Sequence, residues 1–193
     1  MPDPEPDPEP GSGGVWLITG VQASGKSTIA ELLARRYARG VHVRGGQFYR
    51  WTVRGWIHAH VGDDEARRHL ALRYRLAARV ADEYAAEGFT VVVQDNVYGD
   101  DVTGLLGAVV ARPRRLVVLA PSRDAVAARD EARRRTTGKV AYRPGQYTID
   151  GLMAALAETP RVGLRLDTSR ETPEQTVAEI VAREPEAVVD GAV

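Results

Sequence analysis

One stretch constrains the fold more than any other: residues 15–28, with the sequence VWLITGVQASGKST. It holds the pattern G-x-x-x-x-G-K-[ST], formed by Gly20, Gly25, Lys26 and Ser27, between an apolar run and a helical pattern. The two glycines permit a tight turn that brings consecutive backbone N–H groups to face a phosphate chain. The helix that follows directs its positive end at the same anion. The stretch therefore predicts a strand, a phosphate-binding loop and a helix.

The polar positions of this loop predict nucleotide binding. Lys26 is expected to reach the β- and γ-phosphates, and the Ser27 hydroxyl is placed to ligate Mg²⁺. Ile29, Leu32 and Leu33 follow at helical spacing, so we prefer this interpretation to a glycine-rich turn that binds nothing. We predict that the nucleotide contacts these loop residues: Gly20, Gln22, Ala23, Ser24, Gly25, Lys26, Ser27 and Thr28.

The composition agrees with a soluble enzyme. The 193 residues favour one domain with a full core, and 26 basic residues balance 26 acidic ones, so we expect no nucleic-acid partner. The chain has no cysteine, which excludes disulfides, thiolate metal sites and thiol nucleophiles. Its apolar runs are too short for a membrane span and its acidic start is unlike a signal peptide. We therefore predict a cytoplasmic protein with no membrane partner, and leave the oligomeric state open.

Proline and the order of apolar segments set the predicted domain organisation. Residues 1–14 repeat a D-P-E-P unit and end in Gly and Ser, which predicts a disordered leader. Residues 15–193 are predicted to form one domain, with a tail after about residue 184. Within it we expect strands at residues 15–18, 41–44, 89–93, 116–119 and 162–166. We expect helices at residues 27–38, 48–60, 65–87, 102–110, 122–135, 148–157 and 173–183.

This alternation of strands and helices predicts an α/β fold with a parallel sheet and helices on both faces. In such sheets the chemistry lies beyond the carboxyl ends of the strands. Asp95 ends the strand Val91-Val92-Val93, and an apolar strand that ends in an acidic residue is typical of a carboxylate that orients Mg²⁺. The alternative is a carboxylate that caps a loop. We favour Asp95 as a metal residue beside Ser27.

Arginines gather before an unpatterned stretch at residues 136–146. Their spacing places Arg129 and Arg133 on one helical face, at the start of what we predict to be a lid. Phosphoryl transfer needs fixed cations over the developing charge, and a closing lid excludes water. The alternative is a solvated helix face in an arginine-rich chain.

Four features recur here in an order that resembles the small P-loop kinases, and within them the chloramphenicol 3-O-phosphotransferase-like group. They are the loop from Gly20 to Ser27, a strand that ends in Gln94-Asp95, the helix at residues 125–133, and Leu166-Asp167-Thr168-Ser169. The resemblance covers about residues 15–183. It implies a five-stranded sheet of order 2-3-1-4-5, an Arg-rich lid, and ATP-dependent phosphorylation of a small hydroxyl compound. It also implies that Asp167 lies near the adenine.

The chain departs from that pattern at one position. Those kinases usually carry an aspartate just after the second strand, where it takes the proton from the substrate hydroxyl, and the matching residue here is Gly46. Asp95 then takes over as base, or a loose transition state needs little base help, or the protein no longer catalyses the transfer. The acceptor pocket is expected to contain Arg44, Gln47, Tyr49 and Trp51. For Trp51 and Trp56, core packing explains the residues as well as substrate contact does.

The sequence thus predicts an ATP- and Mg²⁺-dependent phosphotransferase that acts on a hydroxyl of a small molecule, an antibiotic or secondary metabolite. Its predicted catalytic residues are Lys26, Asp95, Arg129 and Arg133. The alternatives are a nucleotide-binding protein without transfer activity, a nucleoside-monophosphate kinase and a polynucleotide kinase. The identity of the acceptor is open.

Overall fold

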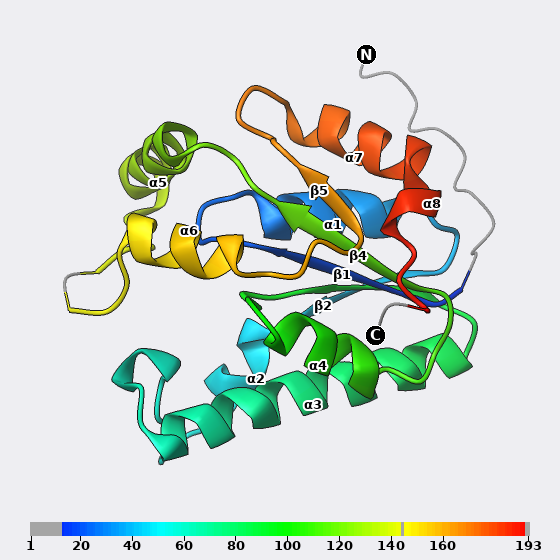
Figure 1. The fold of residues 1–193 in the computed structure, drawn as a ribbon, viewed down its shortest axis with the longest axis horizontal. Helices are drawn as coiled ribbons and strands as arrows, with labels where there is room; N and C mark the ends of the chain where they lie inside the picture. Colours follow the sequence, from blue (N-terminus) through cyan, green and yellow to red (C-terminus); the bar gives the residue numbers. More distant parts are fainter. Residues whose placement is uncertain (1–12, 144, 192–193) are drawn as a thin grey trace.

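Five parallel strands form one sheet at the centre of the molecule (Figure 1). The computed structural model describes residues 13–143 and 145–191, so most of the predicted leader lies outside the described residues. The strands are β1 (Val15–Gly20), β2 (Gly40–Arg44), β3 (Thr90–Gln94), β4 (Arg114–Leu119) and β5 (Leu164–Leu166). Their order is β2-β3-β1-β4-β5, which confirms the predicted sheet.

Helices cover both faces of the sheet. They are α1 (Lys26–Arg35), α2 (Gly46–Arg50), α3 (Asp64–Ala86), α4 (Asp101–Ala108), α5 (Arg123–Thr137), α6 (Ile149–Ala157), α7 (Pro173–Ala182) and α8 (Glu184–Ala187), with a 3₁₀ turn η1 (Ala59–Val61). In Figure 1, α3 and α4 lie below the sheet, and α1 and α7 lie above it. The core is divided into two clusters, one on each face of the sheet, because successive residues of a strand point to opposite faces.

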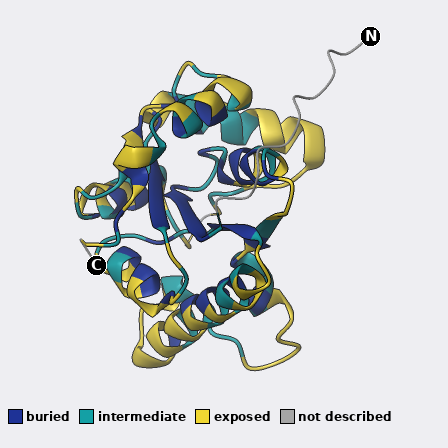
Figure 2. Ribbon diagram, turned by 90° about the vertical axis from the view of Figure 1, so that its right-hand side faces the viewer, coloured by how far each residue is buried: buried dark blue, intermediate teal, exposed yellow. Residues whose placement is uncertain are grey.

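The two halves of the core show this division. Leu17 and Val93 pack in the cluster that includes residues of α3, α4 and α6. Trp16 and Val92 pack in the second cluster, with residues of α1 and α7. All of β1 is buried, and Figure 2 shows buried strands between helices whose outer surfaces are exposed. Burial on both faces explains why these strands read as unbroken apolar runs.

The prediction of one helix over residues 48–60 is wrong beyond its first turn. Helix α2 ends at Arg50, and the chain then runs irregularly to η1. Trp51 is 70% exposed, Val53 is fully exposed, and Gly55 has a φ of +89°. A segment with no apolar face to bury lacks the packing that stabilises most helices in proteins.

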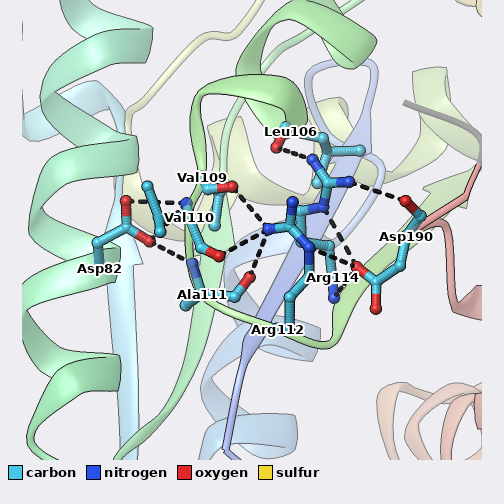
Figure 3. A network of polar contacts seen from close by, with 8 residues as sticks. All are labelled: Asp82, Leu106, Val109, Val110, Ala111, Arg112, Arg114 and Asp190. Atoms are coloured by element: carbon cyan, nitrogen blue, oxygen red, sulfur yellow. Dashed lines mark hydrogen bonds and ion pairs between the residues drawn. The ribbon is translucent and has the colours of Figure 1, made fainter.

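The last part of the chain, predicted as a tail after about residue 184, contains α8 and buries Ala187 and Val189. A polar network at the amino end of β4 holds this segment (Figure 3). Arg114 donates to the carboxylate of Asp190 and to the carbonyl of Leu106. Asp82 of α3 accepts hydrogen bonds from the N–H groups of Val110 and Ala111. These contacts lie at the edge of the sheet opposite the loop that follows β1, so they stabilise the fold from the far side.

Candidate functional site

The loop between β1 and α1 adopts a conformation that depends on its small residues. Ala23 has a φ of +62° and Gly25 a φ of +96°, both in the left-handed region. A Cβ atom on Gly20 would lie 2.6 Å from the carbonyl oxygen of Leu119 and 2.7 Å from the Ser24 hydroxyl. The loop therefore packs too closely against β4 for any larger residue at position 20.

Lys26 is the buried cation of this loop. Its Nζ donates to the carbonyl oxygens of Gly20 at 2.8 Å and Val21 at 2.7 Å. Burial is the main cause that lowers the pKa of Lys26 to about 7, and the charges of Arg73 and Arg133 contribute to the same shift. A bound phosphate would reverse this effect, because an adjacent anion favours the protonated amine. The local charge is therefore arranged for an anionic ligand.

Two buried hydroxyl groups near the loop also indicate a polar ligand. Ser24 Oγ and Thr168 Oγ1 have no hydrogen-bond partner among the described residues, and both residues line the cavity in front of the loop. Ser27 and Thr28, at the start of α1, are exposed to that cavity. Buried polar groups are nearly always paired in folded proteins, so unpaired hydroxyls that border a cavity indicate a polar ligand.

The cavity has a volume of about 1320 Å³. It extends from the loop, past the end of β3, to the segment between α2 and α3, and to α5 and α7. Among the predicted site residues, its walls include Gln22, Ala23, Ser24, Gly25, Lys26, Ser27, Thr28, Tyr49, Asp95, Arg129 and Arg133. Residues that sequence analysis placed on different elements thus meet around one space.

Other predicted site residues lie outside the cavity walls, and Gly20 supplies only backbone behind the loop. Arg44 is exposed and pairs with Glu31 on α1 at 3.4 Å. Trp51 packs edge-on against Phe48, 5.2 Å between ring centroids. Gln47 is half-buried on α2 and is not among the residues that border the cavity.

Asp167, predicted near the adenine, is exposed and bonds locally. It accepts hydrogen bonds from the N–H and hydroxyl groups of Ser169, and the hydroxyl bond is the larger cause of its lowered pKa. The next residue, Thr168, borders the cavity in its place.

Asp95 is buried and bound by a partner that sequence analysis missed. Arg73 of α3 donates from Nε to Asp95 Oδ2 at 2.6 Å, and its Nη2 contacts Oδ1. The N–H of Asn96 also donates to Oδ1 at 2.7 Å. A Cβ on Gly45 would lie 2.1 Å from Oδ2, so glycine at that position gives the carboxylate its space. Direct ligation of Mg²⁺ by Asp95 would have to displace Arg73.

Arg129 and Arg133 occupy the cavity side of α5. Arg129 donates to the backbone carbonyls of Ser24 and Thr168, and so joins the phosphate-binding loop to the segment after β5. Arg133 borders the cavity and acts electrostatically on Lys26. After α5, the Tyr142 hydroxyl donates to the carbonyl of Gln22 at 2.8 Å. The predicted lid thus already contacts the loop.

Rings form the wall farther from α7, and of these the sequence predicted Tyr49 and left Trp56 open between substrate contact and core packing. His58 lies 5.1 Å from Tyr49 and 5.8 Å from His60, between ring centroids. Trp56 lies 6.1 Å from Tyr49, and Tyr147 lies 5.7 Å from His60. Three of the four histidines of the chain fall at positions 58, 60 and 69, and that clustering was the signal available in the sequence.

The comparisons with known proteins agree with this geometry. A family model described as an AAA domain, AAA_33, matches residues 15–160, which include the loop, Arg73, Asp95 and both lid arginines. The chain belongs to this family. Among curated proteins no significant match is found.

Solved structures of kinases share the fold of this AAA domain protein. An unliganded sugar kinase from Janibacter sp. HTCC2649 is 18% identical, with a TM-score of 0.66 over 91% of this chain and 96% of its own. A gluconokinase from Sinorhizobium meliloti 1021 is 20% identical, with a TM-score of 0.54 over 88% and 90%. Shikimate kinase from Acinetobacter baumannii is 12% identical, with a TM-score of 0.59 over 89% and 92%. The fold is therefore that of the P-loop kinases. Among the described helices, none has the length and apolarity to cross a membrane.

Proposed function

We propose that this protein transfers the γ-phosphate of ATP to a hydroxyl group of a small molecule, an antibiotic or another secondary metabolite. The observation that carries the proposal is the position of Lys26. Its buried amine lies at one wall of a cavity that continues past Asp95 to a wall of rings. A site that only binds a nucleotide does not require this second, aromatic compartment.

The nucleotide end of the cavity offers groups for each part of Mg·ATP. The loop N–H groups and Lys26 would bind the β- and γ-phosphates, and the Ser27 hydroxyl would hold Mg²⁺, which neutralises phosphate charge when bound. Asp95 fits a role in the water shell of the metal better than direct ligation, because Arg73 holds its carboxylate. Arg133 would stabilise charge on the transferred group, while Arg129 fixes the loop.

The ring wall indicates the shape of the acceptor. Tyr49, Trp56 and His58 line the cavity with aromatic rings, which suit a ring-shaped or partly apolar compound that carries a hydroxyl. Sugar, gluconate and shikimate kinases share the fold, and their names place hydroxyl compounds among the acceptors to test first.

The test is a kinetic screen of the full-length protein with Mg·ATP against sugars, D-gluconate, shikimate and chloramphenicol. Formation of a phosphorylated product with one of them, and its loss in Lys26→Ala, is the expected result. Lys139→Ala is the matched control, because it removes the other lysine of the chain, which is exposed where Lys26 is buried. Tight ATP binding with no transfer to any compound would overturn the proposal and favour a protein that binds nucleotide without catalysis.

A further inference from the structure

The acceptor side of the cavity lacks the carboxylate expected after β2. A Cβ atom at Gly46 would meet only the ring of Tyr49, at 3.7 Å, so the space for a carboxylate exists but is not filled. Asp95, the other candidate, is 3% exposed and has both oxygens bound by Arg73 and Asn96. A carboxylate in a buried ion pair is a weaker base than an unpaired one, because its protonation would leave Arg73 without its counter-charge.

Among the described residues, two other carboxylates line the cavity. Glu171 lies near the start of α7 and accepts a hydrogen bond from the Thr176 hydroxyl at 2.7 Å. Asp101, the first residue of α4, is exposed to the cavity and makes no side-chain hydrogen bond or ion pair within the part of the chain that the structure describes. Asp101 is therefore the carboxylate of this cavity with its oxygens free.

Asp101 lines the same cavity as the phosphate-binding loop and the ring wall, and backbone and side-chain contacts connect its segment to the loop. Its N–H donates to the carbonyl of Tyr98, and the Tyr98 hydroxyl donates to the carbonyl of Gly20, which also accepts from Lys26. On the other side Asp101 acts electrostatically on Tyr74 of α3. Helices α2, α3 and α4 lie on the same side of the sheet (Figure 1), the side that holds Tyr49.

We propose that Asp101 is the general base of the phosphotransfer, in the place of the carboxylate missing at Gly46. This inference rests on the proposed function. As the acceptor oxygen forms its bond to the γ-phosphorus, the bond from that phosphorus to the β–γ bridging oxygen breaks and ADP leaves. The proton of the acceptor hydroxyl passes to a carboxylate oxygen of Asp101.

The surroundings of Asp101 suit this task. Burial raises its pKa, and the neighbouring charge of Asp100 raises it further. A carboxylate with a raised pKa is a stronger base. Tyr74 of α3 is the titratable group on another element with which Asp101 interacts electrostatically, and burial raises the pKa of this phenol, so it stays neutral.

The decisive experiment compares Asp101→Asn with Asp100→Asn, using the acceptor on which the wild type is most active. We expect kcat of Asp101→Asn to fall about 10²- to 10⁴-fold, with KM changed little and ADP affinity unchanged by calorimetry. Asp100 lies outside the cavity wall, so its variant should keep kcat at pH 8. It should also shift the acidic limb of the kcat profile to lower pH, because the pKa of Asp101 falls when the neighbouring charge is removed.

Two further measurements separate a base from a structural residue. ¹³C NMR of labelled aspartate, with Asp101→Asn to assign the signal, should show that Asp101 titrates above the usual 3.8 and that Asp100→Asn lowers this value. Adding Gly46→Asp to Asp101→Asn should recover part of the lost kcat. Full kcat in Asp101→Asn would overturn the inference while the proposed function stands. The same holds if Asp101→Asn loses both its fold and its activity and Gly46→Asp restores neither. If the wild type phosphorylates none of the compounds, the proposed function fails and Asp101 has no proton to accept.

Discussion

Nucleotide binding should take up a proton at Lys26. In the ligand-free protein burial and two nearby arginines hold the pKa of this amine at about 7, whereas the phosphates of a bound nucleotide favour its charged form. At pH 8 the free amine is therefore about nine-tenths neutral, and binding of ADP should take up about 0.9 proton per molecule. At pH 6 the amine is already charged, and the uptake should fall to about 0.1 proton.

The same coupling makes affinity depend on pH. The dissociation constant for ADP should rise about fivefold between pH 7 and pH 8, which is about 1 kcal/mol of binding free energy. Titration calorimetry in two buffers that differ in ionisation enthalpy measures the uptake directly. At pH 8 the phosphates of ADP are themselves ionised and contribute little, because their second pKa lies near 6.

Two variants test the origin of the effect. Lys26→Arg keeps a positive charge at every accessible pH, so the uptake should disappear even where weaker binding persists. Arg133→Gln removes one of the charges that lower the pKa of Lys26, so its uptake at pH 8 should be smaller than that of the wild type. Uptake below about 0.2 proton at pH 8 in the wild type, or full uptake in Lys26→Arg, would refute the assignment to Lys26.

Three further outcomes can be measured on the same protein. Asp82→Ala removes the acceptor of two backbone N–H groups and should lower the free energy of unfolding by about 0.5–1.5 kcal/mol in urea titrations, with ADP affinity unchanged. Glu83→Ala, exposed at the next position of α3, should change it little, and equal losses would contradict the role of the network. Gly45→Ala should lower the melting temperature, because its Cβ overlaps the Asp95 carboxylate, whereas Gly46→Ala should be tolerated. A larger loss in Gly46→Ala than in Gly45→Ala would contradict the close approach of Gly45 to Asp95. Arg129→Ala should weaken ADP binding without loss of stability, because the arginine joins two backbone segments of the site, and an unchanged dissociation constant would exclude that role.

Much of the fold follows from local sequence. Residues 15–28 specify a strand, a turn and a helix within one continuous segment, so glycine positions and apolar periodicity suffice to predict them. The sheet order was predicted through the resemblance to small P-loop kinases and is confirmed. Helix 48–60 was overpredicted, because α2 ends at Arg50 and Trp51, the next residue, is exposed and has no helix packing to join.

The chemistry around Asp95 depended on tertiary structure. The sequence places Asp95 at the end of a strand, but Arg73 precedes it by 22 residues on a long helix, and nothing local indicates that the two pair. Asp101 and His58 likewise reach one cavity from separate elements.

The sequence by itself determined where a phosphate chain can bind, because that site is built from the backbone of one short loop and the helix that follows it. Only the tertiary structure decided which carboxylate is neutralised and which is free. Ion pairs, burial and the pKa values that result depend on distances between side chains from different elements, and packing of α3 and α4 against the sheet sets those distances.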